Sequence, residues 1–258
     1  WDVGADLGFF DNRLTASGDY YIRKTTDMIV MGPTVPDVFG ASSPKGNYAD
    51  MTTRGYEISL EWHDRFDLAG KPFNYSIKAT LADYYSVIDK FNNANYTLST
   101  NANQSLAGNY YEGMRIGELW GFVSNGLWQD QASIDAAEAG AIAAGQKYYN
   151  PLMQTSKTYK LYPGDVKFED LNGNGYIDRG KNTVDDPGDR KIIGNEEPRY
   201  IYSFTLSGDW NNIWFNAFFQ GVGKQDWYPS NEASVFWGQY NRPYNQMPTW
   251  HVDNYWTP

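Results

Sequence analysis

The chain has 258 residues and no cysteine, and its 31 acidic against 21 basic residues leave a formal charge of -10. This acidic balance excludes the basic stripe of a nucleic-acid-binding protein, and the missing cysteine excludes disulfides, thiolate metal sites and cysteine nucleophiles. A mean hydropathy of -0.63, without an apolar run of about 20 residues, excludes a membrane protein built from spanning helices.

Residues 1–9 alternate apolar and polar side chains, which predicts a strand with one apolar face made of Trp1, Val3, Ala5, Leu7 and Phe9. A turn at residues 11–13 follows. The alternation then resumes with Leu14, Ala16, Gly18, Tyr20 and Ile22. The two alternating segments, residues 1–9 and 14–22, therefore predict a hairpin with a short connection.

Two further pairs of alternating segments predict two more hairpins. Residues 56–63 and 73–82 form one pair, joined through residues 65–72. Residues 200–206 and 213–219 form the other, across a turn at residues 209–212. In each pair the apolar positions share one face and the polar positions share the other.

Long irregular stretches are expected between the hairpins, at residues 24–53, 84–198 and 221–258. Bacterial outer-membrane barrels alternate short and long connections in this way, and their tilted strands cross the membrane in about 9 to 11 residues. In a barrel the apolar faces would meet lipid and the polar faces a wet lumen. Several aromatic residues near the strand ends would form the interfacial girdles: Trp1, Tyr20, Trp62, Phe73 and Tyr200.

A soluble antiparallel sandwich with one dry and one wet face per sheet produces the same alternation. The strands alone leave both architectures open. The alternative to a membrane barrel is a secreted β-sandwich. The loop and the aromatic residues described below would make it calcium-stabilised and able to bind polysaccharide.

One helix is expected inside the long central stretch, at residues 131–146. Its Ala and Glu residues favour a helix, and Ser133 is the expected cap. We assign no chemistry to this helix.

The strongest local motif is a loop rich in Asp, Asn and Gly at residues 170–178. Its spacing of oxygen atoms is that of a short loop that wraps a hard cation such as Ca²⁺, with Gly175 at the sharp turn. The twelfth position holds Lys181, so the loop is not an intact EF-hand, and a later acid has to close it: Asp185, Asp186 or Asp189. The predicted ligands in the loop are Asp170, Asn172, Asn174, Tyr176 through its carbonyl, and Asp178. The alternative is a metal-free turn, since the same residues favour turns.

Catalysis has little support in the sequence, which contains only two histidines, His63 and His251. Glu57 and Glu61 share a strand face but lie about 13 Å apart by strand rise, beyond the about 5 to 9.5 Å that separates glycosidase carboxyl groups. We therefore predict that the chain is not an enzyme.

The last stretch is dense in aromatic residues with polar neighbours. Such rings stack on sugars or fill a partner interface, and packing among the loops themselves explains them equally well. The candidates for substrate or partner contact are Trp227, Tyr228, Trp237, Tyr240, Tyr244 and Trp250.

Several segments, in order, resemble the SusC/RagA family of TonB-dependent outer-membrane transporters. They are Gly117-Glu118-Leu119-Trp120-Gly121-Phe122, Asn125-Gly126-Leu127-Trp128, Pro163-Gly164-Asp165-Val166-Lys167-Phe168 running into the Asp170 loop, Asp189-Arg190-Lys191-Ile192-Ile193-Gly194-Asn195, Pro198-Arg199-Tyr200, Phe218-Phe219-Gln220-Gly221 and Trp256-Thr257-Pro258. The position of Asp189 before Arg190 in this pattern makes Asp189 the preferred acid to close the calcium loop, although residues 179–188 insert two further acids.

The resemblance implies an all-β fold, with antiparallel strands of a large transmembrane β-barrel of about 22 strands and long extracellular loops. Residues 1–258 would be part of the C-terminal half of that barrel, without the plug domain and the final strands. It also implies an outer-membrane location, with a SusD-like surface lipoprotein as a lid and TonB acting through the missing N-terminal region. The expected cargo is a glycan or a peptide.

Overall fold

The computed structural model describes residues 1–33, 35–98, 110–154, 160–227, 249 and 252–257. The chain divides into two compact units. The first contains residues 1–92, 111–117 and 196–226, and the second contains residues 93–110, 118–195 and 227–258.

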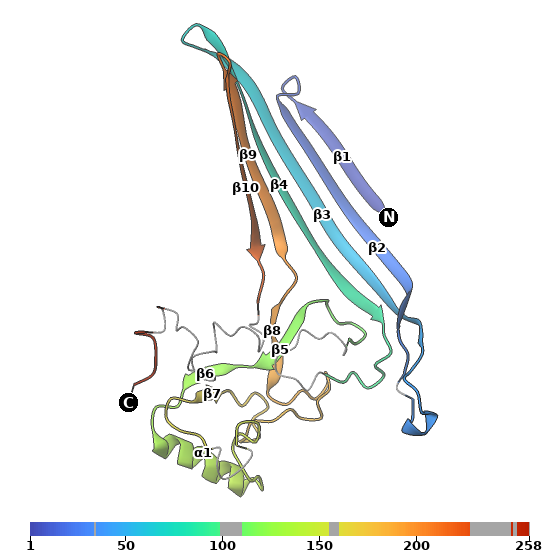
Figure 1. Ribbon diagram of the computed structural model, residues 1–258, viewed down its shortest axis with the longest axis vertical. Coiled ribbons are helices and arrows are strands. Elements are labelled where there is room, and N and C mark those ends of the chain that lie inside the picture. The colour runs from blue at the N-terminus through green and yellow to red at the C-terminus, as the bar shows by residue number, and fades with distance from the viewer. Residues whose placement is uncertain (34, 99–109, 155–159, 228–248, 250–251, 258) are drawn as a thin grey trace. The chain divides into compact units, whose positions relative to one another are not determined.

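The first unit is built on one six-stranded antiparallel sheet with the order β1-β2-β3-β4-β9-β10 (Figure 1). Its strands are β1 (Asp2–Phe9), β2 (Leu14–Met31), β3 (Lys45–Leu68), β4 (Lys71–Lys90), β9 (Arg199–Trp210) and β10 (Ile213–Lys224). Each strand pairs with the next along the chain, apart from the excursion between β4 and β9. The sheet is open, with β1 and β10 at its two edges.

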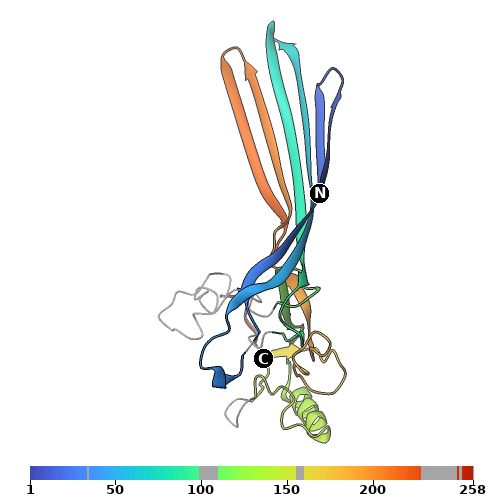
Figure 2. The same cartoon turned by 90° about the vertical axis from the view of Figure 1, so that its right-hand side faces the viewer.

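The three predicted hairpins are confirmed, and their short turns lie together at one end of the sheet (Figure 2). The connection predicted at residues 65–72 is wrong, because β3 and β4 run on to a two-residue turn at Ala69–Gly70. Both turn residues have positive φ, 52° and 74°, as the right-handed twist of a tight hairpin requires. The third hairpin turns in the same way at Asn211–Asn212, within the predicted range, with φ of 51° and 66°.

The long connections are shorter than predicted, because the strands continue beyond the alternating segments. Residues 24–31 and 45–53 belong to β2 and β3, and residues 84–90 belong to β4. The pairing of β2 with β3 passes an irregularity at Asp27, which has φ of 57° and whose amide donates to Asp50 Oδ1 at 2.8 Å. The alternation already ends before this irregularity, because Lys24, Thr52 and Arg54 occupy positions of the apolar face, and the pattern therefore hid the extensions of β2 and β3. The connection that remains, residues 32–44, contains the short helix η1 (Asp37–Phe39).

Among its described residues, the second unit holds two small antiparallel pairs and one helix. β5 (Glu118–Phe122) pairs with β8 (Arg190–Asn195), and β6 (Ser124–Leu127) pairs with β7 (Val166–Phe168). A core of buried side chains holds this unit together: Trp128, Ile134, Ala141, Tyr149, Leu161 and Ile177. Its packing includes an edge-to-face contact between the rings of Trp128 and Tyr149, with centroids 5.7 Å apart.

The predicted helix is confirmed as α1 (Gln131–Ala143). The predicted cap is wrong, because Asp130 caps the helix and accepts from the Ser133 amide at 2.8 Å. The Ser133 hydroxyl donates to the same carboxylate at 2.9 Å, so the hydroxyl supports the cap instead of forming it.

No helix among the described residues is long and apolar enough to cross a membrane.

Candidate functional site

One face of the six-stranded sheet is apolar from edge to edge. The pairing register aligns Leu7, Ala16, Leu60, Ala79, Phe204 and Phe219 in one row across all six strands. Large side chains on this face are exposed: Val3, Leu7, Phe9, Tyr20, Ile58, Leu60, Ile77, Tyr202, Phe204, Phe215 and Phe219. A contiguous exposed apolar surface of this kind marks an interaction with a membrane or another protein.

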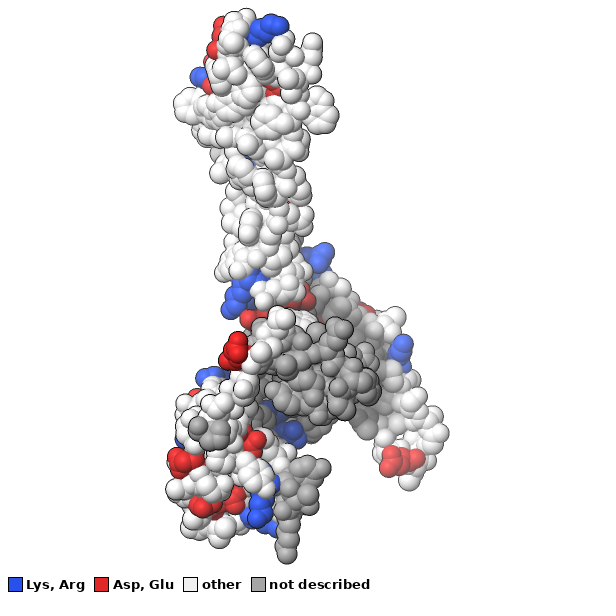
Figure 3. Space-filling view, turned by 60° about the vertical axis from the view of Figure 1, so that its left-hand side comes forward, with Lys and Arg blue, Asp and Glu red and all other residues white. Residues whose placement is uncertain are grey.

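The opposite face is polar and carries a ladder of hydroxyl groups. Hydrogen bonds join Ser76 to Ser207 at 2.7 Å and Thr80 to Ser203 at 2.6 Å. On β1 to β4 the same face also carries charged residues: Asp2, Asp6, Asp19, Glu57, Glu61 and Lys78. Figure 3 shows one side of the molecule, where charged side chains gather at the ends of the long strands with a largely uncharged stretch between. The predicted division into an apolar and a polar face therefore agrees with the register.

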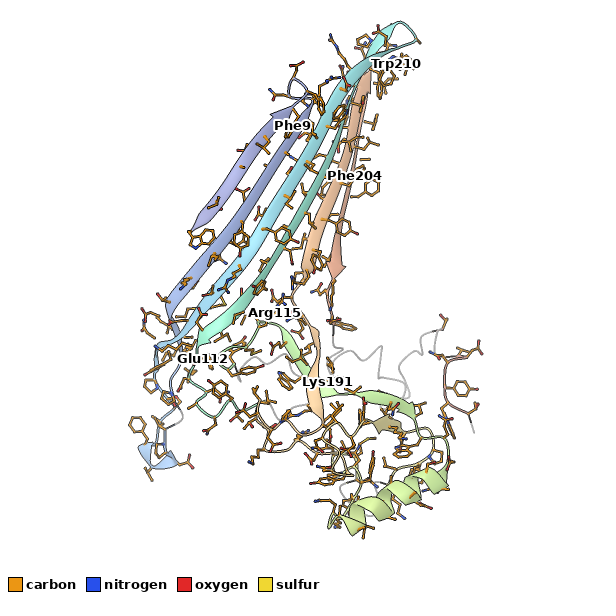
Figure 4. The ribbon with its side chains drawn as sticks, turned by 180° about the vertical axis from the view of Figure 1, so that it is seen from behind. Phe9, Glu112, Arg115, Lys191, Phe204 and Trp210 are labelled. Carbon is orange, nitrogen blue, oxygen red and sulfur yellow. The ribbon has the colours of Figure 1, made fainter. Side chains whose placement is uncertain are left out.

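Aromatic rings gather at both ends of the apolar rows. Towards the long connections, the rings of Trp1 and Tyr20 lie 5.7 Å apart. Towards the short turns, the ring centroids of Phe66 and Phe73 lie 5.2 Å apart. Trp210 donates through Nε1 to the Leu68 carbonyl at 3.0 Å. Figure 4 shows Phe9 and Trp210 near the turn end of the strands and Phe204 farther along them. Two aromatic belts around an apolar band are the arrangement expected of strands that cross a bilayer.

A buried ion pair ties β4 to the start of β9. Arg199 donates through Nε and Nη2 to the two carboxylate oxygens of Asp83, and the Tyr200 amide donates to Asp83 Oδ1 at 3.3 Å. Tyr200 has φ of 56°. The pair joins residues 116 positions apart, so no local sequence signal could have identified it.

In the predicted calcium loop, the polar side chains bond to the loop's own backbone. Asp170 accepts from the amides of Gly173 at 2.7 Å and Gly175 at 2.8 Å. Asn174 accepts from the Tyr176 amide at 3.1 Å and donates to Asp178 Oδ2 at 2.8 Å. These bonds are the Asx turns that Asp and Asn favour.

Asp189 is the acid that lies against this loop. Its carboxylate is buried and accepts from the amides of Leu171 at 2.8 Å, Asn172 at 3.3 Å and Asp178 at 2.7 Å. Burial raises the pKa of Asp189 above its usual value, because a low-dielectric site disfavours the charged carboxylate. The structure thus places the predicted closing acid, Asp189, against the backbone of the loop.

Calcium at this loop stays a prediction. Within the described residues, no group of three or more His, Asp or Glu side chains is arranged to hold a metal ion. Calcium also binds amide and carbonyl oxygens, and the side chains of Asn172 and Asn174 carry amide oxygens. The donor set fits a hard cation, and the backbone bonds provide a metal-free alternative.

We expect calcium to raise the melting temperature of the full-length, chelator-treated protein and to release or absorb heat on titration. At a concentration of 100 times the dissociation constant, the stabilisation would be about 2.7 kcal/mol. The Asp170→Asn variant should lose this response, and Asp135→Asn, an exposed acid on α1, should keep it. Absence of both heat and stabilisation in the parent protein would refute calcium binding.

The late aromatic candidates are only partly placed. Trp227 is exposed, as a contact residue would be. Tyr228, Trp237, Tyr240, Tyr244 and Trp250 lie outside the described residues. Their assignment to substrate or partner contact remains a prediction.

Comparison with known proteins finds relatives over most of the chain. No protein-family profile matches. The chain is 28% identical over 223 residues to TonB-dependent receptor P3 of Formosa agariphila. This match covers 85% of this chain and 19% of that receptor. It is 26% identical over 238 residues to TonB-dependent receptor P39 of the same organism. This match covers 84% of this chain and 21% of the receptor. The chain therefore spans about a fifth of the length of these curated relatives.

Solved structures with the same fold come from RagAB. The match to the RagAB peptide transporter covers 91% of this chain and 22% of the transporter chain, with a TM-score of 0.55 and 17% identity. The match to the RagAB peptide importer in its open-open state covers 86% of this chain and 20% of the importer chain, with a TM-score of 0.56 and 19% identity. At these identities the likeness shows the fold.

Proposed function

Because the chain is a relative of the TonB-dependent transporters of the SusC/RagA family, we propose that it forms part of the wall of an outer-membrane nutrient importer. The predicted fold, antiparallel strands of a partial β-barrel, is confirmed, and so is the outer-membrane location. The relatives carry the names of receptors and transporters, which fits the prediction that the chain is not an enzyme.

The observation that carries this proposal is the apolar row across six strands, with every short turn at one end of the sheet. An apolar face of this width, between two aromatic belts, suits direct contact with lipid. The opposite face, with its hydroxyl ladder, suits a wet lumen. Long connections at the other end of the strands provide the surface that meets cargo and partners outside the cell.

In the proposed mechanism the importer uses binding and movement, with no covalent chemistry. The cargo is an oligosaccharide or a peptide, held on the lumen and loop surfaces under a SusD-like surface lipoprotein. TonB, acting through a region outside this chain, would supply the energy that admits the cargo. The TonB-dependent receptors among the relatives, and a peptide importer among the structures of the same fold, support this class of function.

The alternative was a secreted, calcium-stabilised β-sandwich that binds polysaccharide. A sandwich buries the apolar face of one sheet under a second sheet. Among the described residues, the sheets other than the six-stranded one have two strands each, and the apolar face of the large sheet is exposed. The fold therefore favours the barrel wall.

A pair of neighbouring substitutions tests which face meets lipid. Leu60→Arg places a charge in the middle of the apolar row, and we expect it to lower the stability of the full-length protein in lipid by about 2–4 kcal/mol. Ser59→Arg, on the opposite face of the same strand, should change it much less because its side chain meets water. Folding titrations in lipid vesicles measure both. Equal effects, or a full-length protein that needs neither detergent nor lipid, would contradict the barrel wall.

Uptake by cells that express the full-length protein tests the importer itself. Labelled oligosaccharides and peptides should accumulate in these cells and not in a deletion strain. Addition of a protonophore should abolish the accumulation, since TonB-coupled entry is energised. Equal accumulation in the deletion strain would remove the importer proposal.

A further inference from the structure

Basic residues lie on the apolar face of the large sheet where its apolar band ends. Lys24 and Arg54 are each an even number of residues away from Ala16 and Leu60, which belong to the apolar row. The pairing of β2 with β3 has no shift between residues 14 and 25, so positions an even number of residues apart share a face. Lys24 and Arg54 therefore lie on the face assigned to lipid.

A third basic residue, Arg115, joins this face from the chain between β4 and β5. It forms an antiparallel bridge with Val87, and its guanidinium carbon lies 4.8 Å from the centre of the Tyr85 ring. Tyr85 is the register partner of Arg54. Figure 4 shows Arg115 farther from the short turns than Phe204. The three residues form the basic row: Lys24, Arg54 and Arg115.

The basic row begins where the aromatic belt ends. Tyr20 pairs with Tyr56 in the belt, and Arg54 and Lys24 follow at the second and fourth positions farther along their strands. A rise of about 3.3 Å per residue, on strands tilted by about 45°, puts these positions about 5 and 9 Å beyond the tyrosines. The polar layer on each side of the hydrocarbon is about 5–8 Å thick. The row therefore lies at the level of the lipid head groups.

The protein supplies no counter-ion to Lys24 or Arg54. Lys24 is exposed and Arg54 is half-buried, and neither forms an ion pair with any residue that the structure describes. Asp83, on the same face, is held in the ion pair that ties β4 to β9. Asp89 accepts a hydrogen bond from the Thr52 hydroxyl. The row is thus open to a negative group from outside the chain.

We propose that the basic row binds the phosphate of an anionic lipid head group at the outer rim of the importer. This inference rests on the proposed function, because the row meets lipid only if the apolar face does. Phosphate oxygens accept charge-assisted hydrogen bonds from Lys and from the planar fork of Arg. The acyl chains of the same lipid would lie along the apolar face next to the row.

The position of the row favours a lipid over other anionic partners. Ile22 is the register partner of Arg54, so apolar and basic side chains stand next to each other at this level. A free phosphate ion or an acidic protein surface would satisfy the charges and leave the apolar neighbours without an apolar partner. A phosphate-bearing lipid satisfies both, and basic residues beside a spanning segment are a known mode of anionic lipid binding.

Native mass spectrometry of the full-length protein in a neutral detergent tests the basic row, because it counts bound lipid molecules. The anionic probes are phosphatidylglycerol and diphosphoryl lipid A. The comparison probes are phosphatidylcholine, with the same acyl chains as the phosphatidylglycerol, and inorganic phosphate. We expect the anionic lipids to bind more tightly than phosphatidylcholine, and inorganic phosphate at the same concentration should not displace them.

The double variant Lys24→Gln with Arg54→Gln should bind the anionic lipids about 30-fold more weakly, since each basic residue contributes about fivefold at an anionic lipid surface. The matched control is Arg23→Gln with Lys78→Gln, which removes the same charge from the polar face and should keep the parent affinity. Lys24→Gln alone, at an exposed position, should weaken binding about fivefold and tests the row if the double variant does not fold. Mobility of unheated samples in SDS gels shows which variants form the barrel.

Equal affinity for the anionic lipids and phosphatidylcholine would refute the basic row, and so would equal affinities of the two double variants. Displacement of the lipids by inorganic phosphate would reveal a site for the ion alone, which also refutes it.

Uptake separates failure of the row from failure of the importer, because the row takes no part in admitting cargo. Energised uptake, together with equal affinity for charged and neutral lipids, removes the row and keeps the importer. Lipid binding that depends on Lys24 and Arg54, without energised uptake of any cargo, removes the importer and keeps the row.

Discussion

Replacement of Asp83 by Ala should lower the free energy of unfolding of the full-length protein by about 3–5 kcal/mol, the range measured when one partner of a buried ion pair is removed. Asp83 is 5% exposed and accepts two hydrogen bonds from the Arg199 guanidinium. Without the carboxylate, the arginine is left partly buried with no counter-charge, and the Tyr200 amide loses its acceptor. Urea titration in lipid vesicles, followed by tryptophan fluorescence, measures the change.

The matched control for this prediction is Lys78→Ala. Lys78 Nζ lies 3.8 Å from Glu61 Oε2, and both side chains are substantially exposed, so the loss should be about 0–1 kcal/mol. The double replacement Asp83→Leu with Arg199→Leu should recover much of the loss, since an apolar pair needs no compensation for buried charge. A single Asp83→Ala variant as stable as the Lys78→Ala variant would show that the pair contributes nothing to the fold.

The second large effect is expected at Ile177, the apolar residue of the Asp/Asn loop. Ile177 is 0% exposed and packs in the core of the second unit with Trp128 and Tyr149. Ile177→Ala removes these contacts and leaves a cavity, which costs about 2–5 kcal/mol in well-packed cores. Thermal unfolding of the chelator-treated full-length protein measures the loss without any contribution from calcium.

Ile142→Ala is the same chemical change at an exposed site. Ile142 lies on α1 and is 60% exposed, so its replacement should change stability by no more than about 0.5 kcal/mol. Similar losses in the two variants would mean that the loop is not packed into the core as the structure has it.

The sequence predicted the elements whose period was regular. The alternation of residues 1–9 and 14–22 predicted the first hairpin and its apolar face, and the register confirms both. The extensions of β2 and β3 were missed because Lys24, Thr52 and Arg54 place polar side chains at positions of the apolar face, so the alternation ends there. Local patterns also identified α1, but the choice of Ser133 as its cap failed because the helix begins at Gln131 and Asp130 accepts from the Ser133 amide.

Contacts between distant residues were beyond the reach of local patterns. The pair Asp83 and Arg199, and the seating of Ile177 in a core with Trp128, depend on tertiary contacts that no window of the sequence contains. Asp189 was chosen through the resemblance to a family, and the structure puts its carboxylate against the loop. The aromatic candidates after Trp227 were chosen from composition, and all of them apart from Trp227 lie outside the described residues.

The excursion of residues 91–198 between β4 and β9 has a consequence for the order of folding. β1 to β4 pair through nearby residues, and β9 pairs with β10 across two residues, so both groups can form early. The pairing of β4 with β9 must first close the long excursion, and contacts of high sequence separation form slowly. Because the entropy of closing a loop grows only by about 0.6 kcal/mol for each doubling of its length, this delay adds little to the equilibrium cost. The edge of β4 therefore stays unpaired for longer than any other edge inside the sheet.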